Sequence, residues 1–195
     1  MYFSEFQTLP KNQRLLASIF QAVTPRTAGF NTTDLTLLSG VGRMLLIILM
    51  LIGGSPGSTA GGMKTTTIAV LFANAMSVFR RKEDAQFFGR RIEQNTVKNA
   101  STILMMYLTM FLAGAFIISM MEKIPIGICL FETASAIGTV GLTLGITTQL
   151  GVVSQFVLIV LMFFGRVGGL TLIFAALSGS GRKLSKLPQE KITVG

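Results

Sequence analysis

An internal repeat is the feature that most constrains how this chain can fold. Residues 20–32 read FQAVTPRTAGFNT, and residues 131–143 read FETASAIGTVGLT, so Thr27-Ala28-Gly29-Phe30 lies over Thr139-Val140-Gly141-Leu142. Each copy is followed by an apolar run, at residues 45–54 and again at residues 156–165, an offset of 111 positions. A short polar loop ahead of a membrane-length helix, present twice, is the order typical of a pore loop and its spanning helix.

Composition indicates that the solvent of this chain is a lipid bilayer. Half of the 195 residues are hydrophobic and only 13% are charged, which is too apolar for the surface of a soluble protein. There is no histidine, only eight acidic residues and a single cysteine, Cys129. This leaves few general bases or metal ligands, so we expect neither an enzyme nor a bound cofactor. Cys129 is expected to be a small buried hydrophobe.

The net charge of +9 comes from basic residues gathered in two places. They are Arg80, Arg81, Lys82, Arg90, Arg91 and Lys98 in one connector, and Arg182, Lys183, Lys186 and Lys191 near the end. Both groups flank apolar segments, so the positive-inside rule explains them more simply than a nucleic-acid partner. The rule places both groups in the cytoplasm and both repeated loops near the outer face.

The apolar segments predict an all-α membrane protein with two re-entrant loops. Residues 11–23 and 128–136 have helical patterns too short to cross a bilayer, and read as half-helices. Crossing helices are predicted at 99–121 and 152–177, and a broken crossing at 35–52 and 64–79. The break at residues 53–62 contains five glycines and a proline, which cannot remain helical. The basic connector at 80–98 is expected to contain helical parts.

Three motifs carry a resemblance to a known family. They are RTAGFNT at residues 26–32, GGSPGSTAGGMK at 53–64 and IGTVGLTLG at 137–145. Together they resemble the Ktr/Trk/HKT superfamily of potassium transporters, most of all its Ktr-type membrane subunit. The resemblance implies four consecutive helix, pore-helix, filter, helix units around one pore. It makes residues 1–79 a third unit lacking its first helix, 80–98 a basic cytoplasmic connector, 99–179 a complete fourth unit and 180–195 a basic cytoplasmic tail.

The repeated loops are the predicted selectivity filter. Backbone carbonyls can replace the hydration shell of a monovalent cation, and glycine accepts the backbone angles that aim them at one axis. The predicted filter residues are Thr27, Ala28, Gly29, Phe30, Thr139, Val140, Gly141 and Leu142, with potassium as the transported ion. The threonines are expected at the inner end, and the alanine, phenylalanine, valine and leucine side chains are expected to pack behind the carbonyls. A lone copy would favour an ordinary tight turn, whereas two aligned copies favour a filter.

The glycine-rich break is the predicted gate. Its spacing approaches that of a phosphate-binding P-loop, but Met63 intrudes before Lys64 and no strand precedes it. Irregular backbone at membrane depth is tolerated where it lines a cavity, and the resemblance makes this segment an intramembrane gate. The predicted gate residues are Gly53, Gly54, Ser55, Pro56, Gly57, Ser58, Thr59, Ala60, Gly61, Gly62 and Arg166. Arg166 is expected to contact the loop, with a purely structural clamp as the alternative.

Two further side chains and the partners complete the predictions. Glu132 either attracts cations or braces its loop, with bracing favoured, and Lys64 either lines the cavity or snorkels to the interface. The resemblance implies the lipid bilayer, the N-terminal half of the transporter, a second copy as a homodimer and a cytosolic nucleotide-binding regulatory ring, in a bacterial plasma membrane (cell inner membrane). Alternatives are a sodium-selective or sodium-coupled transporter, sodium then being a coupling or activating ion, and a non-conducting membrane assembly fragment. The basic connector either contacts the regulatory partner or is a solvated, lipid-facing surface.

Overall fold

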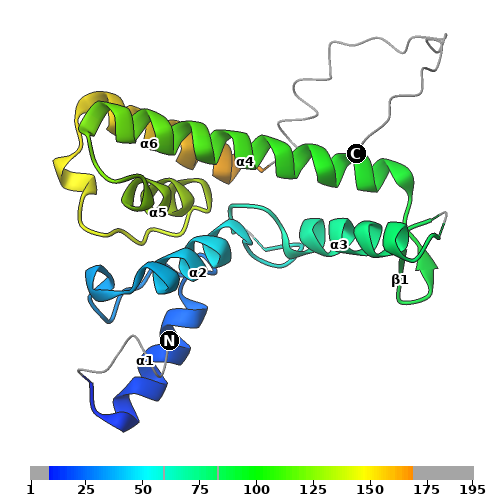
Figure 1. Cartoon of the computed structure of the whole chain (residues 1–195), viewed down its shortest axis with the longest axis horizontal. Coiled ribbons are helices and arrows are strands. Elements are labelled where there is room, and N and C mark those ends of the chain that lie inside the picture. Colours follow the sequence, from blue (N-terminus) through cyan, green and yellow to red (C-terminus); the bar gives the residue numbers. More distant parts are fainter. Residues whose placement is uncertain (1–8, 59, 83, 169–195) are drawn as a thin grey trace.

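The computed structural model describes residues 9–58, 60–82 and 84–168, and its longest element is helix α4, Gln94–Glu122. Helices α2, Gly40–Leu51, and α3, Thr65–Phe79, lie end to end along the same direction as α4 (Figure 1). At about 1.5 Å per residue, the 29 residues of α4 reach about 43 Å, and the 12 of α2 with the 15 of α3 reach about 40 Å. The broken pair therefore matches the length of the continuous helix.

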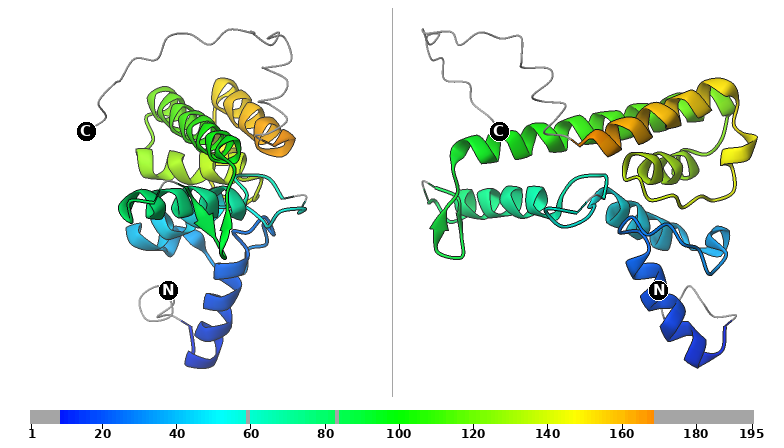
Figure 2. Two further views of the ribbon diagram at one scale, coloured as in Figure 1. Left: turned by 90° about the vertical axis from the view of Figure 1, so that its right-hand side faces the viewer. Right: turned by 180° about the vertical axis from the view of Figure 1, so that it is seen from behind.

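Helix α5, Ile126–Ile137, lies at the centre of the packed part of the molecule. It packs against the second half of α4, against α2 and against α6, Val152–Val167, whereas α3 packs directly on α4 (Figures 1 and 2). Every residue from 131 to 137 of α5 is buried. Small residues allow this close packing, because a Cβ added at Gly165 of α6 would overlap the carbonyl oxygen of Ile137.

Among the described helices, α4 alone is both long enough and apolar enough to cross a bilayer. The shorter apolar helices are α2, α3, α5 and α6. The crossing predicted at residues 99–121 is present, and the helix begins earlier, at Gln94, so Lys98 lies inside it. The half-helix predicted at 11–23 is α1, Lys11–Val23, and the one predicted at 128–136 is α5, which begins two residues earlier.

Helix α1 projects away from the other helices (Figures 1 and 2). Its apolar side chains are exposed, with 74% of Leu16, 57% of Leu15 and 59% of Val23 accessible. No element within the described ranges covers this face of α1. The polar turn that follows leads to a short 3-10 helix, Leu35–Leu37, and Ser39 caps α2 by accepting the Gly42 N–H at 3.1 Å.

Three predicted segments differ from the structure in part. Of the helical parts expected in the connector, residues 94–98 are the start of α4, whereas the described residues before them contain an antiparallel hairpin of β1, Gln86–Phe87, and β2, Arg90–Arg91. The turn residues Phe88 and Gly89 have φ of 48° and 74°, the pattern of a two-residue hairpin turn that favours glycine. The helix expected from residue 35 begins at Gly40 because residues 35–37 form the 3-10 helix.

The third segment is the last crossing, which is predicted to end at residue 177. Helix α6 ends at Val167, and Gly168 leaves helical geometry with a φ of 83°. Residues 169–177 of the predicted crossing and the basic tail at 180–195 lie outside the described residues.

Candidate functional site

The two repeated loops have the same unusual backbone. Thr27 and Gly29 have φ of 68° and 74°, and Thr139 and Gly141 have φ of 53° and 90°. A β-branched residue in the left-handed region is rare, with a cost of roughly 1–2 kcal/mol, so its recurrence at matching positions points to a functional constraint. The sequence repeat is therefore also a repeat of backbone conformation.

Equivalent hydrogen bonds hold both loops to the half-helices before them. The Ala28 N–H donates to the Thr24 carbonyl at 3.1 Å, and the Val140 N–H donates to the Ser135 carbonyl at 2.9 Å. Each loop thus folds back over the C-terminal end of its own half-helix, α1 or α5. These ends carry the partly negative pole of the helix dipole, which favours cations nearby.

The loops face one another across a close backbone contact. A Cβ added at Gly29 would overlap the carbonyl oxygen of Val140 and would lie 3.8 Å from the Gly141 Cα. Glycine at position 29 is therefore required both by its positive φ and by the approach of the second loop. The structure brings Gly29, Val140 and Gly141 together from parts of the sequence more than 100 residues apart.

The side chains of the two loops differ in their surroundings. Val140 and Leu142 are buried, with 4% and 3% of their surfaces exposed, as expected for side chains packed behind a filter. Ala28 is exposed and Phe30 is 72% exposed, contrary to the same expectation. The second loop contacts the first at Gly29, but it does not cover the side chains of Ala28 and Phe30.

Glu132 braces the second loop from within α5. Its carboxylate accepts the Leu144 N–H at 2.8 Å and the hydroxyls of Thr143 and Thr147 at 2.6 and 2.8 Å. The side chain is only 4% exposed. Of the two roles considered from the sequence, these contacts favour bracing.

The glycine-rich loop, residues 53–62, is closed at its base. The Gly53 N–H donates to the Met63 carbonyl at 2.8 Å, and the Thr65 N–H donates to the Gly54 carbonyl at 3.2 Å. At the far side, the buried Gly61 N–H donates to the Thr139 Oγ1 at 3.0 Å. A Cβ at Gly61 would overlap the Thr139 side chain, so the glycine-rich loop lies directly against the second loop.

Lys64 holds the glycine-rich loop in shape. Its ammonium donates to the carbonyl oxygens of Ser58 at 2.8 Å and Ala60 at 2.6 Å. Because the side chain turns back onto the loop and lines the cavity beside it, these contacts favour cavity lining over snorkelling to the interface. Sequence reasoning missed the hydrogen bonds to Ser58 and Ala60, because the direction of the loop carbonyls depends on how the loop folds.

Arg166 lies between two cavities at the end of α6. One, of about 450 Å³, is also lined by Pro56, Ser58 and Lys64 of the glycine-rich segment and by Tyr107 of α4. The other, of about 860 Å³, is lined by residues of the second loop, including Thr139, and of α6. Arg166 is thus brought to the same cavity as the glycine-rich loop, while the contact with the loop that the sequence suggests stays a prediction.

A second carboxylate, also missed from the sequence, joins α4 to α6. Glu122 accepts the Gly151 N–H at 2.8 Å and the Ser154 hydroxyl at 2.6 Å. Within residues 9–58, 60–82 and 84–168, no cluster of three or more histidine, cysteine, aspartate or glutamate side chains could hold a metal ion.

Known proteins are similar to this chain in both sequence and fold. Residues 4–186 match the family of TrkH, described as cation transport protein. The potassium/sodium uptake protein NtpJ of Enterococcus hirae is 41% identical over 189 residues, covering 94% of this chain and 42% of that protein. The Ktr system potassium uptake protein B of Bacillus subtilis is 39% identical over 162 residues, covering 83% of this chain and 36% of that protein.

A solved structure extends the comparison. The crystal structure of the potassium transporter TrkH from Vibrio parahaemolyticus superposes with a TM-score of 0.71 at 25% identity, covering 85% of this chain and 38% of that one. The chain therefore spans about two fifths of the length of these relatives.

Proposed function

Because the chain belongs to the TrkH family of cation transport proteins, we propose that it supplies two loops of a potassium-selective filter and the gate beneath them. It is an all-α membrane protein of a family of transporters, not of enzymes. In this proposal the carbonyls of residues 27–30 and 139–142 replace water around a potassium ion. Selectivity then follows from how the backbone holds those oxygens.

The observation that carries the proposal is the close approach of two loops with the same left-handed backbone. Dehydration of a monovalent cation must be compensated by oxygens at short range, and uncharged carbonyls allow the ion to leave again. Gly29 lies against Val140 and Gly141, so the two loops can offer oxygens to one axis. Two loops make only part of a ring. We therefore include the N-terminal half of the transporter as the partner that completes it.

The gate forms the second part of the proposal. The glycine-rich loop touches Thr139 through Gly61, so it lies on the path of an ion leaving that side of the filter. Lys64 holds the loop folded, and Arg166 adds positive charge to the cavity beside it. Loop and charges together oppose cation passage until the loop moves.

The test is rubidium uptake by a chimera in which this chain replaces the matching C-terminal part of the Enterococcus hirae protein. Purified chimera in proteoliposomes should take up rubidium, and Gly29→Ala should abolish selective uptake because its Cβ meets the Val140 carbonyl. Gly127→Ala is the matched control, since a Cβ there has no neighbour within 4 Å. Normal selectivity in Gly29→Ala would refute the filter assignment.

Sodium transport is the second candidate, favoured by the name of the potassium/sodium uptake relative. Competition separates the two in the same proteoliposomes. Excess potassium should suppress rubidium uptake far more than excess sodium does. Equal suppression, or uptake that requires sodium, would assign the sodium-selective or sodium-coupled function instead.

Assembly belongs to the same proposal. The chain reconstituted alone should not conduct, and addition of the N-terminal half should restore uptake. Failure of that half to restore uptake would favour a non-conducting assembly fragment. We further propose a homodimer, a cytosolic nucleotide-binding ring as regulator and a bacterial plasma membrane as location. The mass of the purified complex, with and without the ring protein, tests the first two.

A further inference from the structure

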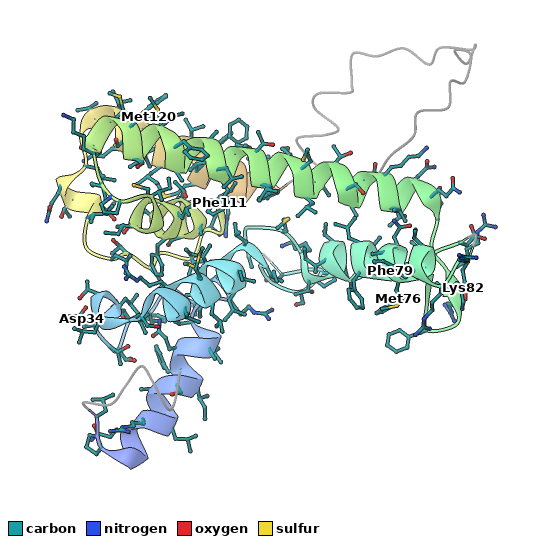
Figure 3. The ribbon with its side chains drawn as sticks, in the orientation of Figure 1. Asp34, Met76, Phe79, Lys82, Phe111 and Met120 are labelled. Atoms are coloured by element: carbon teal, nitrogen blue, oxygen red, sulfur yellow. The ribbon has the colours of Figure 1, made fainter. Side chains whose placement is uncertain are left out.

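A small amphipathic groove lies where α3 meets the hairpin, far from the two loops. It has a volume of about 150 Å³ and is lined by Phe72, Ala73, Met76, Ser77, Arg80, Lys82, Gln86 and Phe87. The side chains from α3 are mainly apolar, while Arg80 and Lys82 bring positive charge where the chain leaves that helix. Figure 3 shows Met76, Phe79 and Lys82 at this end of α3.

Aromatic side chains continue the apolar surface around the groove. Phe79 is 83% exposed, Phe72 is 66% exposed, and Phe88 at the hairpin turn is 93% exposed. Phe72 lies in the middle of α3, Phe79 is its last residue and Phe88 lies in the hairpin that follows, where we expect the chain to pass from bilayer to water. Exposed aromatic residues next to basic ones, in that position, are typical of contact with the headgroup region of a membrane.

The charge of the connector favours an anionic occupant. Residues 80–98 contain six basic and three acidic residues. The one ion pair formed within its described part joins Arg91 to Asp84 at 3.0 Å, and neither residue lines the groove. Lys82 donates to Gln86 at 3.2 Å, which keeps its ammonium beside the groove.

We propose that this groove binds one anionic phospholipid of the cytoplasmic leaflet. The phosphate is held by Arg80 and Lys82, and the first part of an acyl chain lies along Phe72, Met76 and Phe87. A phospholipid joins a charged and an apolar end, and the groove likewise has basic side chains beside apolar ones. Such a contact goes beyond the proposed pore and does not depend on whether the two loops conduct.

Tryptophan fluorescence offers a direct test, because the chain contains no tryptophan. Phe87→Trp places a single reporter in the groove of the full chain in lipid nanodiscs. Brominated phosphatidylglycerol and brominated phosphatidylcholine, each present at the same fraction, then report which lipid lies beside it. We expect the reporter to be quenched about tenfold more efficiently, per lipid, by the anionic one. Phe72→Trp is a second reporter in case the first disturbs the hairpin.

A charge-matched pair of variants separates a site from a diffuse surface. Arg80→Gln with Lys82→Gln should remove most of that preference, since these are the two basic residues that line the groove. Arg81→Gln with Lys98→Gln removes the same charge from exposed positions of the connector that do not line the groove, and should leave most of the preference.

Three results would overturn the proposal. They are equal quenching by the two lipids, equal effects of the two double variants, and a reporter in contact with water that neither lipid quenches. The last result would assign the groove to a protein partner.

Discussion

Replacing Lys64 with methionine should open the proposed gate. The ammonium makes two short hydrogen bonds, to the carbonyls of Ser58 and Ala60, and methionine keeps an apolar stem without either bond. A hydrogen bond to a charged group contributes about 1.5–3 kcal/mol when buried. Ser58 is exposed and Lys64 is half-buried, so water replaces part of this when the bonds are lost.

We therefore expect the pair of bonds to contribute about 1–2 kcal/mol to the folded loop. Since 1.4 kcal/mol is a factor of ten in an equilibrium constant, the open population should rise about 5- to 30-fold. If the loop is folded in most molecules, rubidium uptake by the chimera should rise by the same factor, up to the limit of the open pore.

The assay is initial rubidium uptake at equal protein content, with two controls. Lys98→Met removes the same charge from an exposed position on α4, and should leave uptake near the parent rate. Lys64→Arg keeps charge and donors and should also stay close to the parent. A Lys64→Met chimera that folds normally, yet transports no faster than the parent, would refute the clamp. An equal rise in Lys64→Gln would assign the effect to charge repulsion instead.

Three further predictions concern single side chains. Glu132→Ala should lower the free energy of unfolding by about 2–4 kcal/mol, seen as a lower thermal midpoint in detergent, because it leaves a buried backbone N–H without its acceptor; Glu132→Gln should lose less. Gly165→Ala should destabilise by about 1–3 kcal/mol in the same measurement, since its Cβ meets a carbonyl at the end of α5, and a stable variant would contradict that packing. Thr139→Val should raise rubidium uptake by the chimera while Thr139→Ser does not, because only the hydroxyl accepts the Gly61 N–H; equal uptake in both would contradict the contact.

The sequence predicted the elements that are marked by a local pattern of residues. The repeat located α1, α5 and the loops after them, and five glycines with a proline marked the break between α2 and α3. Apolar length alone identified α4. These signals depend only on residues close together in the sequence, so they can be recognised without knowing which distant segments pack together. The division into units at residues 1–79 and 99–179, and the roles of the filter and gate residues, stay predictions.

What the sequence did not predict depends on contacts between distant segments. The hairpin at 86–91 occupies a charged stretch that has neither helical nor alternating periodicity, so only its turn glycine gave a signal. The ammonium of Lys64 could be placed only once the loop carbonyls were placed. Similarly, the partners of Glu132 come from a return segment 11 to 15 residues later, whose path the α5 helix does not determine.

The closed base of the glycine-rich loop has a mechanical consequence. Backbone hydrogen bonds join Gly53 to Met63 and Gly54 to Thr65 at the base of the loop. We therefore expect a rearrangement of the residues between them to leave helices α2 and α3 in place. Once its contacts with Thr139 and Lys64 break, we expect that the loop can rearrange while α2 and α3 keep their positions along α4. Changes in its length or composition should alter how readily the path opens while leaving the surrounding scaffold unmoved.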